Sequence, residues 1–76
     1  MNQPRRKKLE SISEKISELK DLLEEIKEEE EEYKENMPEN LWGSERYERA
    51  EEAVGQLEEA DDYLDQVIGL IEEVIS

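Results

Sequence analysis

Residues 35–47 read "ENMPENLWGSERY" and divide the chain into two halves of similar length. This stretch holds the sole tryptophan, one of the two prolines and the first of the three glycines. Pro38 disfavours helix at the residue before it, and asparagine and glycine are residues that turns prefer. Ser44 is a good N-cap, and the glutamate that follows it complements a helix dipole. The stretch therefore predicts a turn over residues 37–44 between two helices.

Before this turn, apolar residues recur at alternating steps of three and four. They are Leu9, Ile12, Ile16, Leu19, Leu23, Ile26 and Tyr33, with Glu30 at the one missing position. This heptad pattern is typical of a helix that packs along one stripe. Neither glycine nor proline interrupts the pattern, so we expect the first helix over about residues 5–36.

After the turn, the apolar pattern is wider and predicts a second helix over about residues 45–75. One stripe consists of Tyr47, Ala50, Val54, Leu57, Leu64, Ile68, Ile71 and Ile75, with Asp61 as its polar exception. A second stripe, at strict seven-residue spacing, consists of Ala53, Ala60, Val67 and Val74. Gly55 and Gly69 lie inside this helix, and we interpret them as points where another helix approaches closely.

Folding the halves back on each other pairs residues whose numbers add to about 80. The pairs are Leu9 with Ile71, Ile12 with Ile68, Ile16 with Leu64, Leu23 with Leu57, Ile26 with Val54, and Tyr33 with Tyr47. This agreement predicts an all-α fold, an antiparallel two-helix hairpin in a single domain over residues 1–76. Leu41 and Trp42 would then cover the end of the apolar seam. Trp42 is also a candidate contact for a partner, because exposed tryptophan is a favoured interface anchor.

The second stripe, Ala53, Ala60, Val67 and Val74, predicts a homodimer. The flanks of the first helix are mostly polar, with only Leu22 apolar: Lys8, Lys15 and Glu29 lie on one side, and Ser13, Lys20, Lys27 and Lys34 on the other. We therefore expect the first helix to pack against one neighbour and the second helix against two, which gives a four-helix bundle in the dimer. Because many acids of the second helix are expected near this stripe, Arg46, Arg49 or the partner's lysines must screen them. Otherwise the stripe would serve a different, more basic protein.

The turn also carries a resemblance. Residues 36–53, "NMPENLWGSERYERAEEA", resemble a motif of small acidic proteins encoded by phages and mobile elements of Gram-positive gut bacteria. Those proteins read roughly N-[IM]-P-E-N-L-x-G-S-E-R and continue into a helix rich in alanine and glutamate. Trp42 stands where a polar residue is common in that motif. The resemblance implies a helical hairpin of phage or mobile-element origin, and it implies no activity.

Composition argues against catalysis and against cofactors. The chain has no histidine and no cysteine, which removes the commonest general base, the usual zinc ligands and thiol nucleophiles. The segment "DDYLDQVIG" at residues 61–69 lacks the alternating spacing of a calcium loop. We expect a protein that is not an enzyme, with no catalytic residues, no cofactor and no specific metal.

A formal net charge of −14, from 24 acids and 10 bases, disfavours direct binding to nucleic acid or to anionic membranes. The basic run at residues 5–8 is followed by acidic residues and not by an apolar segment, so we expect no signal peptide and a cytoplasmic protein. In the hairpin this run would lie near Glu72 and Glu73 and pair with them.

Two functional hypotheses remain open. The first is a helical adaptor or assembly protein that forms a dimer, in which acidity only provides solubility. The second is an anti-defence inhibitor that mimics DNA and blocks a nucleic-acid-binding host protein, because acids gather along the expected rod. The candidate acidic surface consists of Glu28, Glu29, Glu31, Glu32, Glu51, Glu52, Glu58, Glu59, Asp62 and Asp65.

Overall fold

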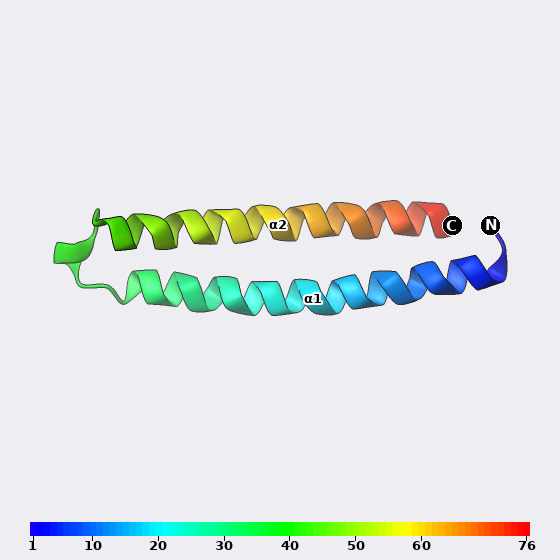
Figure 1. Cartoon of the computed structure of the whole chain (residues 1–76), viewed down its shortest axis with the longest axis horizontal. Helices are drawn as coiled ribbons and strands as arrows, with labels where there is room; N and C mark the ends of the chain where they lie inside the picture. The colour runs from blue at the N-terminus through cyan, green and yellow to red at the C-terminus, as the bar shows by residue number, and fades with distance from the viewer.

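The computed structural model describes the whole chain, residues 1–76, as two long helices that lie side by side (Figure 1). Helix α1 spans Gln3–Glu35, a short 3₁₀ turn, η1, spans Glu39–Leu41, and helix α2 spans Glu45–Ile75. The two helices are antiparallel, with both termini at the end opposite the turn. The molecule is a rod of 59 × 15 × 13 Å. The predicted all-α hairpin is thus confirmed.

Helix α1 begins two residues earlier than the sequence pattern suggested. The side-chain Oδ1 of Asn2 accepts a hydrogen bond from the backbone N–H of Arg5 at 3.0 Å, which caps the helix. Pro4 lies in the first turn, where its missing N–H would have had no helical partner in any case. A proline at this position therefore starts a helix and does not interrupt one.

The turn is built from local hydrogen bonds and one positive backbone angle. Gly43 has φ +86°, a conformation that costs glycine little because it has no Cβ. The Oγ of Ser44 then accepts a hydrogen bond from the backbone N–H of Tyr47 at 3.3 Å, as an N-cap should. These two residues set the direction in which α2 leaves the turn.

The tip closes differently from the expectation that Leu41 and Trp42 would cover the seam. Met37 is the residue that becomes buried there, while Leu41 and Trp42 both stay exposed, Trp42 by 52%. The indole N–H of Trp42 donates a hydrogen bond to the Met37 carbonyl at 3.0 Å. Its ring lies 6.0 Å from that of Tyr47, centroid to centroid. Trp42 therefore braces the turn from outside.

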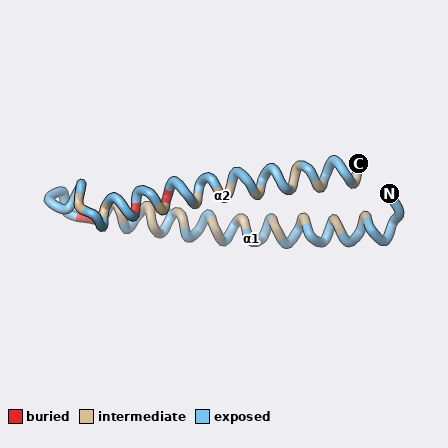
Figure 2. The backbone as a smooth tube through the Cα atoms, turned by 45° about the horizontal axis from the view of Figure 1, so that its top comes forward, coloured by how far each residue is buried: buried red, intermediate tan, exposed pale blue.

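The hairpin buries very little. Only Met37, Ala50 and Val54 are buried, and all three lie at the tip end of the rod (Figure 2). Along the remaining length the facing residues are at most half-buried. A folded domain of this size normally covers a larger core, so most of the apolar surface that the sequence supplies is not covered by the hairpin itself. Neither α1 nor α2 has a stretch that is long and apolar enough to cross a membrane.

Candidate functional site

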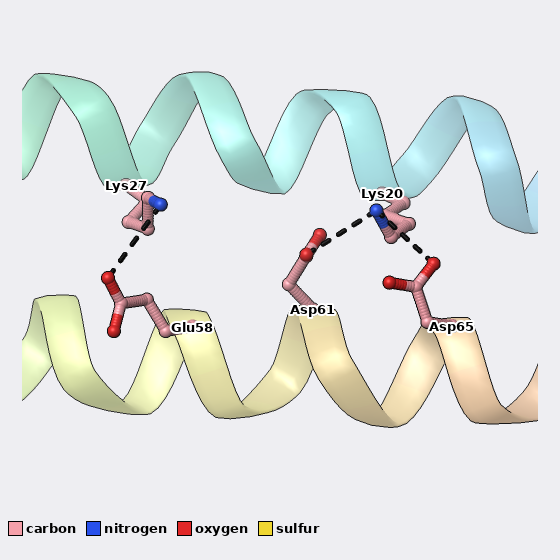
Figure 3. A network of polar contacts seen from close by, with 5 residues as sticks. All are labelled: Lys20, Lys27, Glu58, Asp61 and Asp65. Carbon is pink, nitrogen blue, oxygen red and sulfur yellow. Dashed lines mark ion pairs between the residues drawn. The ribbon is translucent and has the colours of Figure 1, made fainter.

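Ion pairs between the helices fix their register (Figure 3). The Nζ of Lys20 on α1 lies 3.4 Å from an Oδ of Asp61 and 3.3 Å from an Oδ of Asp65, both on α2. The Nζ of Lys27 lies 3.8 Å from an Oε of Glu58. The numbers of the paired residues add to between 81 and 85, close to the predicted 80. Each residue of α1 can thus be assigned a level on α2.

Helix α1 is rotated relative to the expected packing. The residues that it turns toward α2 and half-buries include Leu9, Ser13, Ile16, Lys20, Leu23, Lys27 and Lys34. By contrast Ile12, Ile26 and Tyr33 are about half exposed and Leu19 is 57% exposed. The predicted burial of Ile12, Ile26 and Tyr33 against α2 is therefore wrong.

The lysines explain this rotation. Lys20 and Lys27 reach acids of α2, and the Nζ of Lys34 lies 5.8 Å from the ring centre of Tyr47. The apolar stems of lysine side chains can cover a seam while their charged ends stay in contact with water. In the hairpin this polar flank of α1 takes the place beside α2 that we had assigned to the isoleucines.

The displaced apolar side chains form an open surface on α1. They share one side of the helix because their spacings of three, four and seven residues match its turns. Leu19, Leu22 and Ile26 line an apolar hollow of about 440 Å³ together with Ile16 and Leu23 of the seam and Leu64 of α2. Within the hairpin α1 packs against α2 alone, and this apolar surface stays open.

The second stripe of α2 lies on the same side of the hairpin. Leu64, which lines the hollow, is the helical neighbour of Ala60 and Val67. At the tip, Tyr33 and Arg46 line a common hollow, and Arg46 is seven residues before Ala53. On both helices these apolar residues therefore lie on the same side of the hairpin, and we call this set of residues the apolar face. It consists of Ile12, Leu19, Leu22, Ile26 and Tyr33 of α1 with Ala53, Ala60, Val67 and Val74 of α2.

The acids of α2 are divided between two sides: Glu58 and Asp65 lie away from the apolar face, whereas Glu45 and Glu59 lie on its flank, where they pair with Arg49 and Tyr63. Glu58 and Asp65 pair with the lysines on the opposite side, and residues seven positions from them, Glu51 and Glu72, follow the same line. Around the apolar face α2 carries Arg46, Arg49, Gln56, Tyr63 and Leu70.

The ten residues of the candidate acidic surface do not form one cluster. Nine are exposed and Glu31 is half-buried. Glu58 and Asp65 take part in the ion pairs described above, so their charges are partly compensated. The remaining acids are distributed along both helices and leave a rod with a broadly negative outer surface.

Three carboxylates, those of Asp61, Asp62 and Asp65, come within 4.8 Å of one another. The ammonium group of Lys20 lies against two of them. Its hydrogen bond to Asp65 is the largest cause that raises the pKa of Lys20 above its ordinary value, while partial desolvation acts in the opposite direction. Asp61 and Asp65 thus form the acidic half of an interhelical ion-pair cluster, with Asp62 next to them.

Two smaller expectations also change. No ion pair links the basic run at residues 5–8 to Glu72 or Glu73, so these bases remain available to another molecule. A Cβ added at Gly55 or Gly69 would meet nothing within 4 Å, so these glycines do not mark a close approach inside the hairpin. Their heptad line also contains Glu48 and Asp62 and points away from the apolar face.

Comparison with known proteins gives no family assignment. No protein-family model matches the chain, and neither a curated protein nor a solved structure matches it.

Proposed function

We propose that this protein is a non-enzymatic protein-interaction module, a helical adaptor or assembly protein whose working unit is a homodimer. Two hairpins pack through their apolar faces and form a four-helix bundle. The observation that carries this proposal is the apolar face itself, which runs along both helices and is left open by the hairpin. The tip motif supports a phage or mobile-element origin, with action in the cytoplasm of the bacterial host.

The small core supports a second copy as the occupant. A hairpin with three buried residues has little hydrophobic burial to offset the conformational entropy of ordering its chain. Exposed apolar surfaces of this extent on small domains usually mark interfaces. In the bundle, the heptad stripe Leu9 to Tyr33 and both stripes of α2 would point to one shared core, as a and d positions do.

Charge supports the same occupant. Each chain carries a net charge of −14, so two copies repel at long range and can associate only where acids are few. The apolar face itself contains no acid: Glu58 and Asp65 lie on the opposite side with Lys20 and Lys27, and Glu45 and Glu59 on its flank pair with Arg49 and Tyr63. The face also offers Arg46 at its tip end, next to Arg49, which pairs with Glu45 of its own helix.

The test places one charge in each half of the face. We expect Leu19→Asp combined with Val67→Asp to abolish the dimer, because each carboxylate would be buried in an apolar core without a partner. Light scattering should report about 9 kDa, or an unfolded chain, for this variant and about 18 kDa for the wild type.

A matched control comes from Ser17→Asp with Gln66→Asp, which adds the same charge at exposed positions off the face. This control should remain a folded dimer. A wild type that is already a folded monomer contradicts the proposal, and so does an equal loss of association in the control and in the face variant.

DNA mimicry is the second candidate, favoured by the shape and charge of the rod. The molecule is 59 Å long, and residues 50–76 contain nine acids and no base. Carboxylates spaced along such a rod can imitate duplex phosphates, which carry one charge per roughly 1.7 Å of axis. The protein would then act in anti-defence by occupying the groove of a nucleic-acid-binding host protein.

Salt distinguishes the two candidates. A complex held by mimicry weakens steeply between low and moderate ionic strength, whereas apolar association hardly responds. We therefore expect the dimer to persist in moderate salt. If the only association detected in host extract is with a basic protein and disappears in moderate salt, DNA mimicry replaces the adaptor role.

A further inference from the structure

We infer that the second copy packs antiparallel, with the two tips at opposite ends of the bundle and α1 of one copy against α1 of the other. This inference rests on the proposed dimer and specifies its geometry. A two-fold axis would cross the rod at its middle, at the level of Leu22 on α1 and Ala60 on α2.

The charge distribution along α1 favours this direction. Residues 1–15 contain five bases and two acids, whereas residues 16–35 contain ten acids and three bases. Two copies of such a helix attract when they run antiparallel, because the basic run at residues 5–8 of each comes level with residues 37–40 of the other, about 8 Å along the rod from its glutamate run at residues 28–32. Beside the apolar face, Lys15 of one copy comes level with Glu29 of the second copy. Neither residue has an ion-pair partner within the hairpin.

Helix α2 gives the same direction independently. Its bases, Arg46 and Arg49, lie in its first turns together with Glu45 and Glu48, and its last turns contain Glu72 and Glu73 without a base. Antiparallel pairing of α2 with its own copy brings the end that contains Arg46 and Arg49, the second of which also pairs with Glu45, to the acidic end of the other chain. Like charges come level near the two-fold axis, where Glu18 lies across from Glu25 and Glu59 across from its own copy. They also come level farther out, at the pairs Glu10 with Glu35, Glu14 with Glu31, and Glu48 with Glu72.

The apolar residues match in the same register. If residues of the two α1 helices lie level when their numbers add to 45, Ile12 of one copy meets Tyr33 of the other, and Leu19 meets Ile26. With pair numbers that add to 120 on α2, Ala53 meets Val67 and Ala60 meets itself. The midpoints of these two series are residue positions 22.5 on α1 and 60 on α2, which add to 82.5. This sum falls within the range of 81 to 85 found for the residue numbers of the ion pairs between α1 and α2. One two-fold axis therefore satisfies both helices.

The other two-fold arrangement, with both tips at the same end, is less favourable. It places α1 beside α2 of the second copy at equal levels. Glu25 and Glu32 of α1 would then lie level with Glu59 and Glu52 of that α2, so the acidic half of α1 would run along the acid-rich helix. Like charges in this position repel each other.

Cysteine cross-linking tests the direction cleanly, because the natural chain has no cysteine. The variant Leu22→Cys should form a disulfide-linked dimer under mild oxidation, since position 22 lies next to its own copy at the axis. The tip variant Asn40→Cys should stay reduced, because the tips are separated by the length of the rod. If Asn40→Cys cross-links and Leu22→Cys does not, the antiparallel arrangement is overturned, although the proposed dimer still stands. A monomeric wild type removes the proposed dimer itself.

A charge exchange tests the same geometry without cysteine. Lys15→Glu should raise the dimer dissociation constant about tenfold, since two ion pairs become two like-charge pairs, and Glu29→Lys added to it should restore most of the affinity. Lys7→Glu is the control with the same charge change at a position off the face. In the arrangement with both tips together, residues 15 and 29 are about 21 Å apart along the rod. Failure of the rescue in a chain that still dimerises therefore overturns the antiparallel arrangement.

Discussion

The loss of stability on truncation of Leu19 distinguishes a hairpin that folds as a monomer from one that completes its core by forming a dimer. In the isolated hairpin Leu19 is 57% exposed. A fully buried leucine loses about 2–5 kcal/mol on replacement by alanine. Scaled by the fraction that the hairpin covers, Leu19→Ala should cost the monomer only about 1–2 kcal/mol.

In the four-helix bundle the loss of stability caused by Leu19→Ala is larger. There Leu19 lies in the shared core of both copies, so Leu19→Ala removes two buried side chains per dimer, worth about 4–10 kcal/mol of dimer stability. Leu23 is the matched comparison, because it is half-buried against α2 in the hairpin already. The dimer predicts similar losses for Leu19→Ala and Leu23→Ala, whereas a monomer predicts a clearly larger loss for Leu23→Ala.

The assay is urea unfolding followed by circular dichroism at several chain concentrations. For the dimer, the unfolding midpoint should rise with concentration, because association stabilises only the folded state. A midpoint that does not depend on concentration, with Leu19→Ala costing less than about 2 kcal/mol and Leu23→Ala costing more, would refute the reasoning.

Three further predictions follow from the hairpin and its charges. Gly55→Ala and Gly69→Ala should each raise the free energy of unfolding by up to about 1 kcal/mol, because an added Cβ meets nothing there and alanine favours helix. Gly43→Ala should lower the free energy of unfolding, because alanine is strained at the positive φ of this position. If denaturant unfolding shows that Gly55→Ala or Gly69→Ala lowers the free energy of unfolding, the surroundings of these glycines are not open. Thermal stability should be higher in high salt, or near pH 5, than at pH 7 in low salt, because 24 carboxylates repel one another, and a decrease under both changes would mean that specific ion pairs dominate. Because the pKa of Lys20 is raised in the folded state, its ion pairs stabilise the fold fully below its ordinary pKa of 10.5. This stabilisation is lost as the pH rises through the raised pKa, so the wild type should lose stability relative to Lys20→Met only in strong alkali.

The sequence was sufficient for the hairpin and its register. Pro38 and Ser44 carry local stop and start signals that depend little on tertiary context, and the heptad spacing fixes which residues share a side of each helix. The start at Gln3 was missed because Asn2 acts as an N-cap, a signal that the sequence does contain. The burial of Met37 depends on how the turn folds under the helix ends and has no periodic signature.

The orientation of α1 could not be predicted from periodicity. The stripe that contains Leu19 and Ile26 indicates which residues belong in a core, but a two-helix seam and a four-helix core give the same stripe. The choice between them depends on the flanking residues Lys20 and Lys27, whose ion pairs with α2 become visible only when both helices are placed. The sequence pattern alone identified both flanks of α1 only as mostly polar.

The most direct test of the dimer is the mass of the wild-type chain in solution, measured by sedimentation equilibrium over a wide concentration range. The dimer predicts about 18 kDa, twice the chain mass of 9.0 kDa, with a decrease on dilution that is accompanied by loss of helix. A mass of 9.0 kDa at every concentration, with the helices intact, would contradict the dimer and leave the apolar face to a different protein.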